Sequence, residues 1–316
     1  MESNPLLSIL IPTYNGASKF LDSVLEYLVK GISLCDTSDI EVIVSNNSST
    51  DNTEEILSKY DKYPFIKHYT NKENIGFARN IILLTDTYAR GEYGWVIGDD
   101  DIVKPDFFAF IIPILKEKRF DYLSLGYQEI RKASEIEFFD NVQYSFAPSS
   151  FASSLEHNDS SLGTFMSSAI FRVSTFQKVS KDCITKKFDT FQSIFPNGYV
   201  NAAAFYDKKC GYITGMAVYP IVHSKDWASS DNSYMIYTRI LPEFYNYILS
   251  LGVNKKDLVR TYNNILCNGL WTGYRRLTKF KKVDGSFLHV ICESFSHPYS
   301  HILLFKLLGE KIFMRK

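Results

Sequence analysis

The sequence lacks an excess of charge of either sign, and it lacks a long apolar run. Its 35 Lys+Arg balance 35 Asp+Glu, so the formal net charge is zero. Proteins that bind nucleic acid generally need a basic surplus to contact phosphates, so no nucleic-acid partner is expected. No uncharged apolar stretch approaches the roughly 20 residues that a membrane-spanning helix needs.

Cysteine is also sparse and unpatterned, which excludes two further classes of protein. Five cysteines lie far apart, and no two form a C-x-x-C pair: Cys35, Cys183, Cys210, Cys267 and Cys292. Neither a zinc site nor a disulfide framework is expected, and a reducing cytoplasm fits better. The amino terminus, MESNPLLSILIPTYN, has no basic segment before its short apolar run, so it does not read as a signal peptide.

What the sequence does have is an alternation of apolar strands and amphipathic helices over its first hundred residues. Strands are predicted at residues 6–12, 40–45, 65–70 and 94–98. Helices are predicted between them, at 18–32, 51–60 and 76–89, the second with Asp51 and Glu54 as a capping box. Strands that alternate with helices of this length form a parallel α/β sheet with right-handed crossovers.

A polar segment follows each predicted strand. The four segments are TYN at 13–15, NNSSTD at 46–51, NKENIG at 71–76 and DDD at 99–101. Ligands of such sheets bind at the carboxyl ends of the strands, so these segments should converge. Three adjacent carboxylates repel one another, and a divalent cation would turn that repulsion into affinity. The alternative for the triple aspartate is a solvated acidic turn.

Four motifs carry a resemblance to a known family. In order and spacing, SILIPTYN, EVIVSNNSSTDNT, NIGFARN and VIGDDDIVKPD resemble family 2 of the inverting glycosyltransferases, whose fold is GT-A, a Rossmann-like, mostly parallel sheet. The W-x-x-G-D-D-D form is most similar to the abequosyltransferase-like branch, whose members build bacterial surface polysaccharides. The resemblance covers residues 6–125. It implies transfer of a sugar from a nucleoside diphosphate, UDP first, to a hydroxyl of a surface glycan or its lipid-linked precursor.

The resemblance also assigns residues to a metal and a nucleotide. Asp100 matches the ligand of Mn²⁺ or Mg²⁺ in relatives, with Asp101 as a further ligand, and Asp99 would lie near the ribose. His223 would approach the metal or the diphosphate, unless it is structural. Gly98 stands where the family usually has its first acid.

The nucleotide site would begin at the end of the first strand. Tyr14, beside Pro12 and Asn15, resembles the aromatic that packs on the nucleobase, although it could be a core tyrosine. Asn47 stands where relatives carry the carboxylate that reads the uracil imide, and an amide could serve uracil, thymine or cytosine. Arg79 would face the phosphates or support the base-binding loop, or form an ion pair beneath it.

The catalytic base is not evident from the sequence. Relatives supply a carboxylate from an E-D pair about a dozen residues before a glycine that opens the strand GYxI, because the attacking hydroxyl must lose its proton. Here Tyr199 and Val200 stand at that place. Asp189 is the first alternative, and Arg172 is expected on the acceptor side. Other carboxylates remain open as the base: Asp207, Asp159 and Asp231.

We expect a transferase domain at residues 1–232 and a helical region at 233–316. Basic and aromatic residues mix in 264–316, which predicts peripheral contact with the inner face of the plasma membrane; the alternative is plain helix packing with the lysines in water. A nucleotidyltransferase is disfavoured, because PTYNGASKF is not a glycine-rich phosphate loop. The missing E-D acid favours a second rival, a non-catalytic sugar-nucleotide-binding or assembly subunit.

Overall fold

The computed structural model describes residues 4–138, 142–158, 163–185, 195–221, 234–280 and 285–296. The chain divides into two compact units, one of residues 1–158 and 163–222, the other of residues 159–162 and 223–316. The functions expected for residues 1–232 and 233–316 stay predictions.

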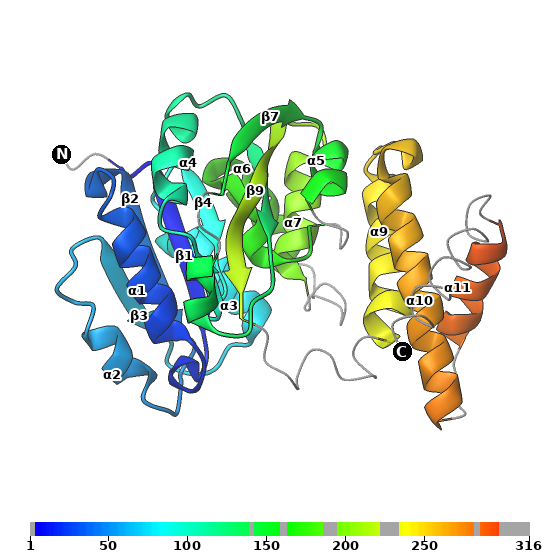
Figure 1. The fold of residues 1–316 in the computed structure, drawn as a ribbon, viewed down its shortest axis with the longest axis horizontal. Coiled ribbons are helices and arrows are strands. Elements are labelled where there is room, and N and C mark those ends of the chain that lie inside the picture. The colour runs from blue at the N-terminus through cyan, green and yellow to red at the C-terminus, as the bar shows by residue number, and fades with distance from the viewer. Residues whose placement is uncertain are drawn as a thin grey trace. The chain divides into compact units, whose positions relative to one another are not determined.

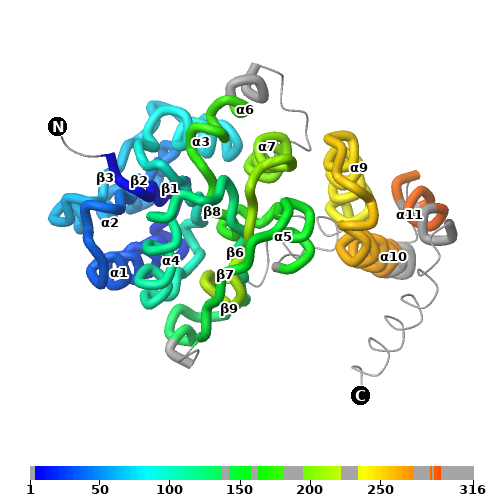
Figure 2. Tube along the Cα trace, turned by 90° about the horizontal axis from the view of Figure 1, so that it is seen from above, coloured from blue at the N-terminus to red at the C-terminus, as the bar shows by residue number. Residues whose placement is uncertain are grey.

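One mixed sheet forms the centre of the first unit (Figures 1 and 2). Its strand order is β3-β2-β1-β4-β8-β6-β9-β5, and β7 pairs with β9. The strands are β1 (Leu7–Thr13), β2 (Ile40–Asn46), β3 (Ile66–Thr70), β4 (Tyr93–Val96), β5 (Asp101–Val103), β6 (Tyr122–Tyr127), β7 (Ser145–Ser149), β8 (Ala169–Arg172) and β9 (Cys210–Pro220). Strands β1 to β4 are mutually parallel, whereas β8 is antiparallel to β4 and β6. The predicted parallel sheet is confirmed for its first four strands.

Helices of the first unit pack on this sheet because their apolar faces match it. They are α1 (Leu21–Ile32), α2 (Thr53–Ser58), α3 (Phe77–Leu83), α4 (Phe107–Lys116), α5 (Phe151–Asn158), α6 (Val173–Thr185) and α7 (Pro196–Phe205). The π-helical turn η3 (Leu84–Tyr88) continues α3, so the helix predicted at 76–89 is present but changes its winding. The Trp95 and Phe107 rings meet edge-on, with centroids 5.7 Å apart, where α4 covers β4.

The capping box predicted at α2 is wrong. Helix α2 begins at Thr53, and Asp51 accepts hydrogen bonds from the backbone N–H groups of Thr53 and Ser18, both at 3.1 Å. Glu54 accepts from Asn46 Nδ2 at 3.0 Å instead of returning to the start of its own helix. Asp51 therefore bonds the start of α2 as well as the loop after β1, whereas Glu54 bonds the end of β2, so the reciprocal half of the capping box is replaced by a tertiary contact.

The second unit is helical, as predicted for the last third of the chain. A π-helical turn, η6 (Ile236–Ile240), leads into α9 (Leu241–Ser250), followed by α10 (Val259–Phe280) and α11 (Gly285–Ser296). A Cβ at Gly269 of α10 would lie 2.9 Å from the Tyr237 carbonyl oxygen, so this glycine permits the close approach of α10 to η6. Within the described part of the chain, no helix is long and apolar enough to cross a membrane.

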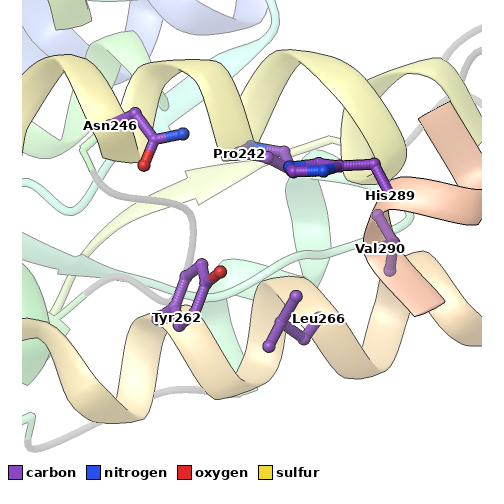
Figure 3. Close-up of a pocket in the computed structure, with 6 residues that line it drawn as sticks. All are labelled: Pro242, Asn246, Tyr262, Leu266, His289 and Val290. Atoms are coloured by element: carbon purple, nitrogen blue, oxygen red, sulfur yellow. The ribbon is translucent and has the colours of Figure 1, made fainter. Parts of the chain in front are cut away.

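A small cavity of about 80 Å³ lies among α9, α10 and α11 (Figure 3). It is lined by Pro242, Asn246, Tyr262, Leu266, His289 and Val290. Tyr262 is fixed by stacking on Tyr245, with ring centroids 4.2 Å apart. The lining contains no carboxylate, lysine or arginine, so it does not offer the charges that a metal and a diphosphate require, and we assign it no ligand.

Candidate functional site

The polar segments after β1 to β4 meet at one edge of the sheet. The Asn47 backbone N–H donates to the Thr13 carbonyl at 2.8 Å, and that of Asn71 donates to the Asn46 carbonyl at 2.9 Å. The Thr13 hydroxyl donates to Asp99 Oδ2 at 2.7 Å, which ties the first loop to the acidic turn. The predicted convergence of these segments is therefore confirmed.

Asp99 forms an ion pair inside this edge. Its side chain is buried, and Lys19 Nζ lies 3.1 Å from each of its carboxylate oxygens. Lys19 follows β1 and is partly exposed. Sequence reasoning missed Lys19, because a single lysine in a loop carries no recognisable pattern.

Asp101 is turned inward. It opens β5, and its Oδ2 accepts hydrogen bonds from the Ser167 hydroxyl and, at 3.2 Å, from the Gly98 backbone N–H. The Trp95 indole N–H donates to the Ser167 carbonyl at 2.8 Å and holds that loop against β4. Burial, and then the charge of Asp100, raise the pKa of Asp101 well above that of an ordinary aspartate. Ser167 could not be found from the sequence, because it lies 66 residues away.

The structure explains the glycine at the position of the family's first acid. A Cβ on Gly98 would lie 2.5 Å from Asp101 Oδ2 and 2.9 Å from Asp100 Oδ1. Both distances are too short for a Cβ. An acidic residue at position 98 would therefore force the side chains of Asp100 and Asp101 to move.

The described residues do not enclose a metal ion by themselves: among them, no three His, Cys, Asp or Glu side chains form a cluster that could hold one. Asp99 is engaged by Lys19, and Asp101 by Ser167. Asp100 is fixed at its backbone, where its carbonyl accepts from the Ile221 N–H at 2.9 Å. Mg²⁺ commonly takes one or two carboxylates and completes its shell with phosphate oxygens and water, so Asp100 fits a metal shared with a diphosphate.

The predicted nucleotide residues lie at or near the same edge. Tyr14 follows β1 directly and its side chain is 40% exposed, which leaves its ring available for stacking. Asn15 has φ 54°, and its Oδ1 accepts from the Thr50 N–H at 2.9 Å, joining the first two loops. Pro12 is buried within β1, and Arg79 is exposed on α3. Their roles in nucleotide binding stay predictions.

Three of the four carboxylates considered as the catalytic base fall outside the described residues: Asp159, Asp189 and Asp231. His223 lies outside them as well. Asp207 is exposed and pairs with Lys208 at 2.9 Å. It precedes the amino end of β9, which is parallel to β6. This is the sheet edge opposite the acidic turn, so the position of Asp207 does not favour it as the base.

Helix α7 carries two buried amides, on either side of Tyr199 and Val200, where the resemblance had led us to expect an acid pair. Asn197 and Asn201 lie one helical turn apart on α7 and are each 2% exposed. Asn197 Nδ2 and Asn201 Oδ1 are buried without a hydrogen-bond partner. Helix α7 contains no carboxylate at all.

Arg172, which we expected on the acceptor side, instead connects the amino ends of strands β4 and β6. It donates to Glu92 Oε1 at 2.6 Å, to Asp121 Oδ1 at 2.8 Å and to the Tyr93 hydroxyl at 2.9 Å. These groups lie at the amino ends of β4 and β6, away from the acidic turn. The structure therefore gives Arg172 a structural role.

Comparison with known sequences identifies the family. The profile described as "Glycosyl transferase family 2" matches residues 8–177, more than half of the chain. This protein belongs to glycosyl transferase family 2. It is 34% identical over 120 residues to abequosyltransferase RfbV of Salmonella typhimurium, covering 37% of this chain and 35% of that protein. It is 26% identical over 180 residues to glycosyltransferase GlyG of Streptococcus pneumoniae, and this match covers 56% of this chain and 57% of that protein. The resemblance to the abequosyltransferase-like branch is thereby confirmed, and the matches span about a third to just over half of these relatives.

Solved structures share the fold over nearly the whole chain. TarS residues 1–349 of S. aureus, in complex with UDP-GlcNAc, superposes with a TM-score of 0.56 at 15% identity, covering 95% of this chain and 88% of that one. A mannosyltransferase from Pyrobaculum calidifontis, in complex with GDP-Man and Mn²⁺, superposes with a TM-score of 0.53 at 10% identity. This match covers 99% of this chain and 89% of that one. At such identities the likeness concerns the fold, and the predicted GT-A class is confirmed.

Proposed function

We propose that this protein is a metal-dependent, inverting glycosyltransferase. It would move a sugar from a nucleoside diphosphate to a hydroxyl of a bacterial surface glycan or of its lipid-linked precursor. The observation that carries the proposal is the acidic turn at the joined carboxyl ends of β1 to β4, in a chain of this family. The family resemblance names UDP as the first donor, and the fold neighbours solved with UDP-GlcNAc and with GDP-Man and Mn²⁺ support a nucleotide-sugar donor.

We assign separate roles to the residues at this edge of the sheet. Tyr14 would stack on the nucleobase, and Asp99 would bind the ribose while holding Lys19 at the edge. Asp100, assisted by Asp101 and His223, would hold Mn²⁺ or Mg²⁺ together with the diphosphate. When bound, the metal would neutralise charge on the leaving diphosphate.

Inversion needs a base on the acceptor side of the sugar. We assign Asp189 as the group that takes the proton of the acceptor hydroxyl. Its sequence position, ahead of α7, is the support for this choice. The proposal also keeps the expected setting, a cytoplasmic protein that touches the inner membrane face through residues 264–316, where lipid-linked acceptors lie.

The test is turnover by the purified full chain. Nucleotide sugars would be incubated with an acceptor fraction, and release of the nucleoside diphosphate would be measured with and without EDTA. Release that EDTA stops and Mn²⁺ restores supports the proposal. Nucleotide binding without any turnover would favour the second candidate, a non-catalytic binding subunit, which the acid-free helix α7 supports.

A further inference from the structure

The segment after β6 runs alongside the carboxyl end of β9. The Ile130 backbone N–H donates to the Pro220 carbonyl at 2.9 Å, and Ile130 forms a parallel bridge with Ile221. Glu129 is therefore the register neighbour of Pro220. On the other side of β9, Pro220 pairs with Asp101 of β5. Glu129 and Asp101 thus flank the same residue of β9, one from each side.

The register places the two carboxylates on one face of the sheet. Residues paired across neighbouring strands point their side chains to the same face, so Glu129 shares a face with Pro220 and Asp101. Two strand spacings separate the backbones of Glu129 and Asp101, which is about 10 Å. Asp101 is buried against Ser167, whereas Glu129 is exposed. An exposed carboxylate therefore stands within reach of a sugar held at the acidic turn.

An aromatic pair borders Glu129 on that face. Tyr127 lies two residues before Glu129, so both side chains point to the same side of the strand. The Tyr127 ring packs on that of Phe165, with centroids 4.4 Å apart, and both side chains are partly exposed. Phe165 lies two residues before Ser167, which bonds Asp101. The register and this contact therefore agree on which face carries the group.

The Glu129 carboxylate is available to a ligand. It forms no ion pair or hydrogen bond with any other residue in the described part of the chain, whereas Asp99 is held by Lys19 and Asp101 by Ser167. An ionised carboxylate only accepts hydrogen bonds, and sugar hydroxyls can donate them. Aromatic rings beside a few polar groups are the usual lining of a binding site, and a ring can pack on the apolar C–H face of a sugar.

The strand order puts this group on the side of the acidic turn that the nucleotide residues leave open. Strands β1 to β3, whose loops carry the predicted nucleotide residues, lie on one side of β4, and β6 and β9 lie on the other. Inversion requires the acceptor hydroxyl to approach the anomeric carbon from the side opposite the leaving diphosphate. An acceptor bound beyond β4 meets that requirement.

Resting on the proposed function, we propose that Tyr127, Phe165 and Glu129 form the acceptor subsite. It takes a sugar ring of the acceptor glycan, with the apolar face of the ring on the aromatic pair and its hydroxyls donating to Glu129. Glu129 is a binding residue in this arrangement, and Asp189 keeps its assigned role in proton transfer.

Steady-state kinetics on the full chain test the subsite, with saturating nucleotide sugar, Mn²⁺ and graded amounts of the glycan acceptor fraction. Glu129→Gln should raise the amount of acceptor that gives the half-maximal rate at least about tenfold, because bonds to a charged group are lost. Tyr127→Leu keeps apolar volume but loses the ring, so it should raise that amount as well. Tyr127→Phe keeps the ring and should stay close to wild type. Calorimetric affinity for the nucleoside diphosphate should be the same in all of them.

Glu117→Gln, at an exposed carboxylate that pairs with Arg119, is the matched control and should behave as wild type. Unchanged half-saturation in both Glu129→Gln and Tyr127→Leu, with an active wild type, would overturn the acceptor subsite alone. A lower turnover number of Glu129→Gln at unchanged half-saturation would also overturn it, because Glu129 would then act in proton transfer. Weaker diphosphate binding by these variants would reveal a structural role and overturn it too. A wild type without turnover would overturn the proposed function and the subsite with it.

Discussion

Three consecutive aspartates stand in different surroundings, although they are neighbours in the chain. Asp99 is neutralised by Lys19, and Asp101 is buried against Ser167. Asp100 lies between them, in the turn whose backbone is fixed by Ile221. A run of identical residues therefore yields three different surroundings, because each aspartate meets a different partner.

Replacing Asp100 by Asn should abolish transfer and remove the Mn²⁺-dependent part of nucleotide binding. The amide keeps the shape of the side chain but loses the charge that a hard cation needs. Binding is measured by calorimetry with and without Mn²⁺, and folding by circular dichroism. Asp61→Asn, at a carboxylate that pairs with His68, is the control. Near wild-type turnover of Asp100→Asn would contradict the metal assignment.

Replacing Tyr14 by Ala should weaken nucleotide binding by about 1–3 kcal/mol, the usual scale for a lost stack between a base and an aromatic ring. Calorimetry with the preferred diphosphate measures the change. Tyr206, with a similarly exposed side chain at the end of α7, supplies the control Tyr206→Ala. Equal affinities of wild type and Tyr14→Ala would remove Tyr14 from the site.

At the scale of elements, the sheet is held at both of its ends by polar contacts. The carboxyl ends of β1 to β4 are tied by the loops of the candidate site, and the amino ends of β4 and β6 are tied by Arg172. The two sets can be disturbed separately, because they lie at opposite edges of the sheet.

Arg172→Met should destabilise the fold by about 2–3 kcal/mol, because two partly buried carboxylates lose a charged donor. The free energy of unfolding is measured in urea. Arg119→Met, at an exposed arginine that pairs with Glu117, should leave stability nearly unchanged. An Arg172→Met protein as stable as wild type would show that the cluster contributes no net stability.

The cluster also predicts a pH dependence. Burial alone would raise the pKa of Glu92, but hydrogen bonds from Lys118 and Arg172 outweigh it and hold that pKa below the usual range. A lowered folded-state pKa gives stability that is present above the unfolded value, near 4.3, and is lost as the pH falls through the folded value. The stability gap between wild type and Arg172→Met should therefore close below about pH 4. A gap that stays constant down to pH 3 would rule out Glu92 as its source.

The sequence predicted elements better than contacts. The short apolar run at 6–12 and the β-branched run at 40–45 become β1 and β2, because a parallel strand buried on both faces is rich in apolar residues. Glu54 was misassigned, since it bonds Asn46 at the end of β2, whereas Asp51 does bond the Thr53 N–H at the start of α2. The bond from Ser167 to Asp101 had no sequence signal, and neither did the register of Glu129 beside Pro220, because both depend on how distant segments meet.

At the scale of the whole molecule, residues 264–316 carry the predicted membrane contact. The aromatic residues in this region alternate with basic ones; they are Trp271, Tyr274 and Phe280. The side chains of the basic residues at 275–282 lie outside the described part of the structure. Each cation near an anionic surface contributes about 1 kcal/mol, and the attraction decays within a Debye length. Wild type should co-sediment with anionic vesicles at low salt and leave them as salt rises.

A glutamine variant of that cluster is the comparison. It replaces Arg275, Arg276, Lys279, Lys281 and Lys282. It should stay in the supernatant, while activity on a short soluble acceptor survives, since the proposed nucleotide site is built from residues of the other unit. Equal sedimentation of both proteins would favour lysines that only solvate a packed helix.

The pairing of β5 with β9 has a consequence for the order in which the protein folds. Strands β1 to β4 can assemble from the first 96 residues, because all of the pairings among these four strands lie within that segment. The acidic turn, however, leads into β5, whose partner β9 ends at Pro220, and Ile221 holds the turn itself. Contacts so distant in sequence form late. A chain emerging from the ribosome can therefore join the loops after β1, β2 and β3 long before it can lock the turn that carries Asp100.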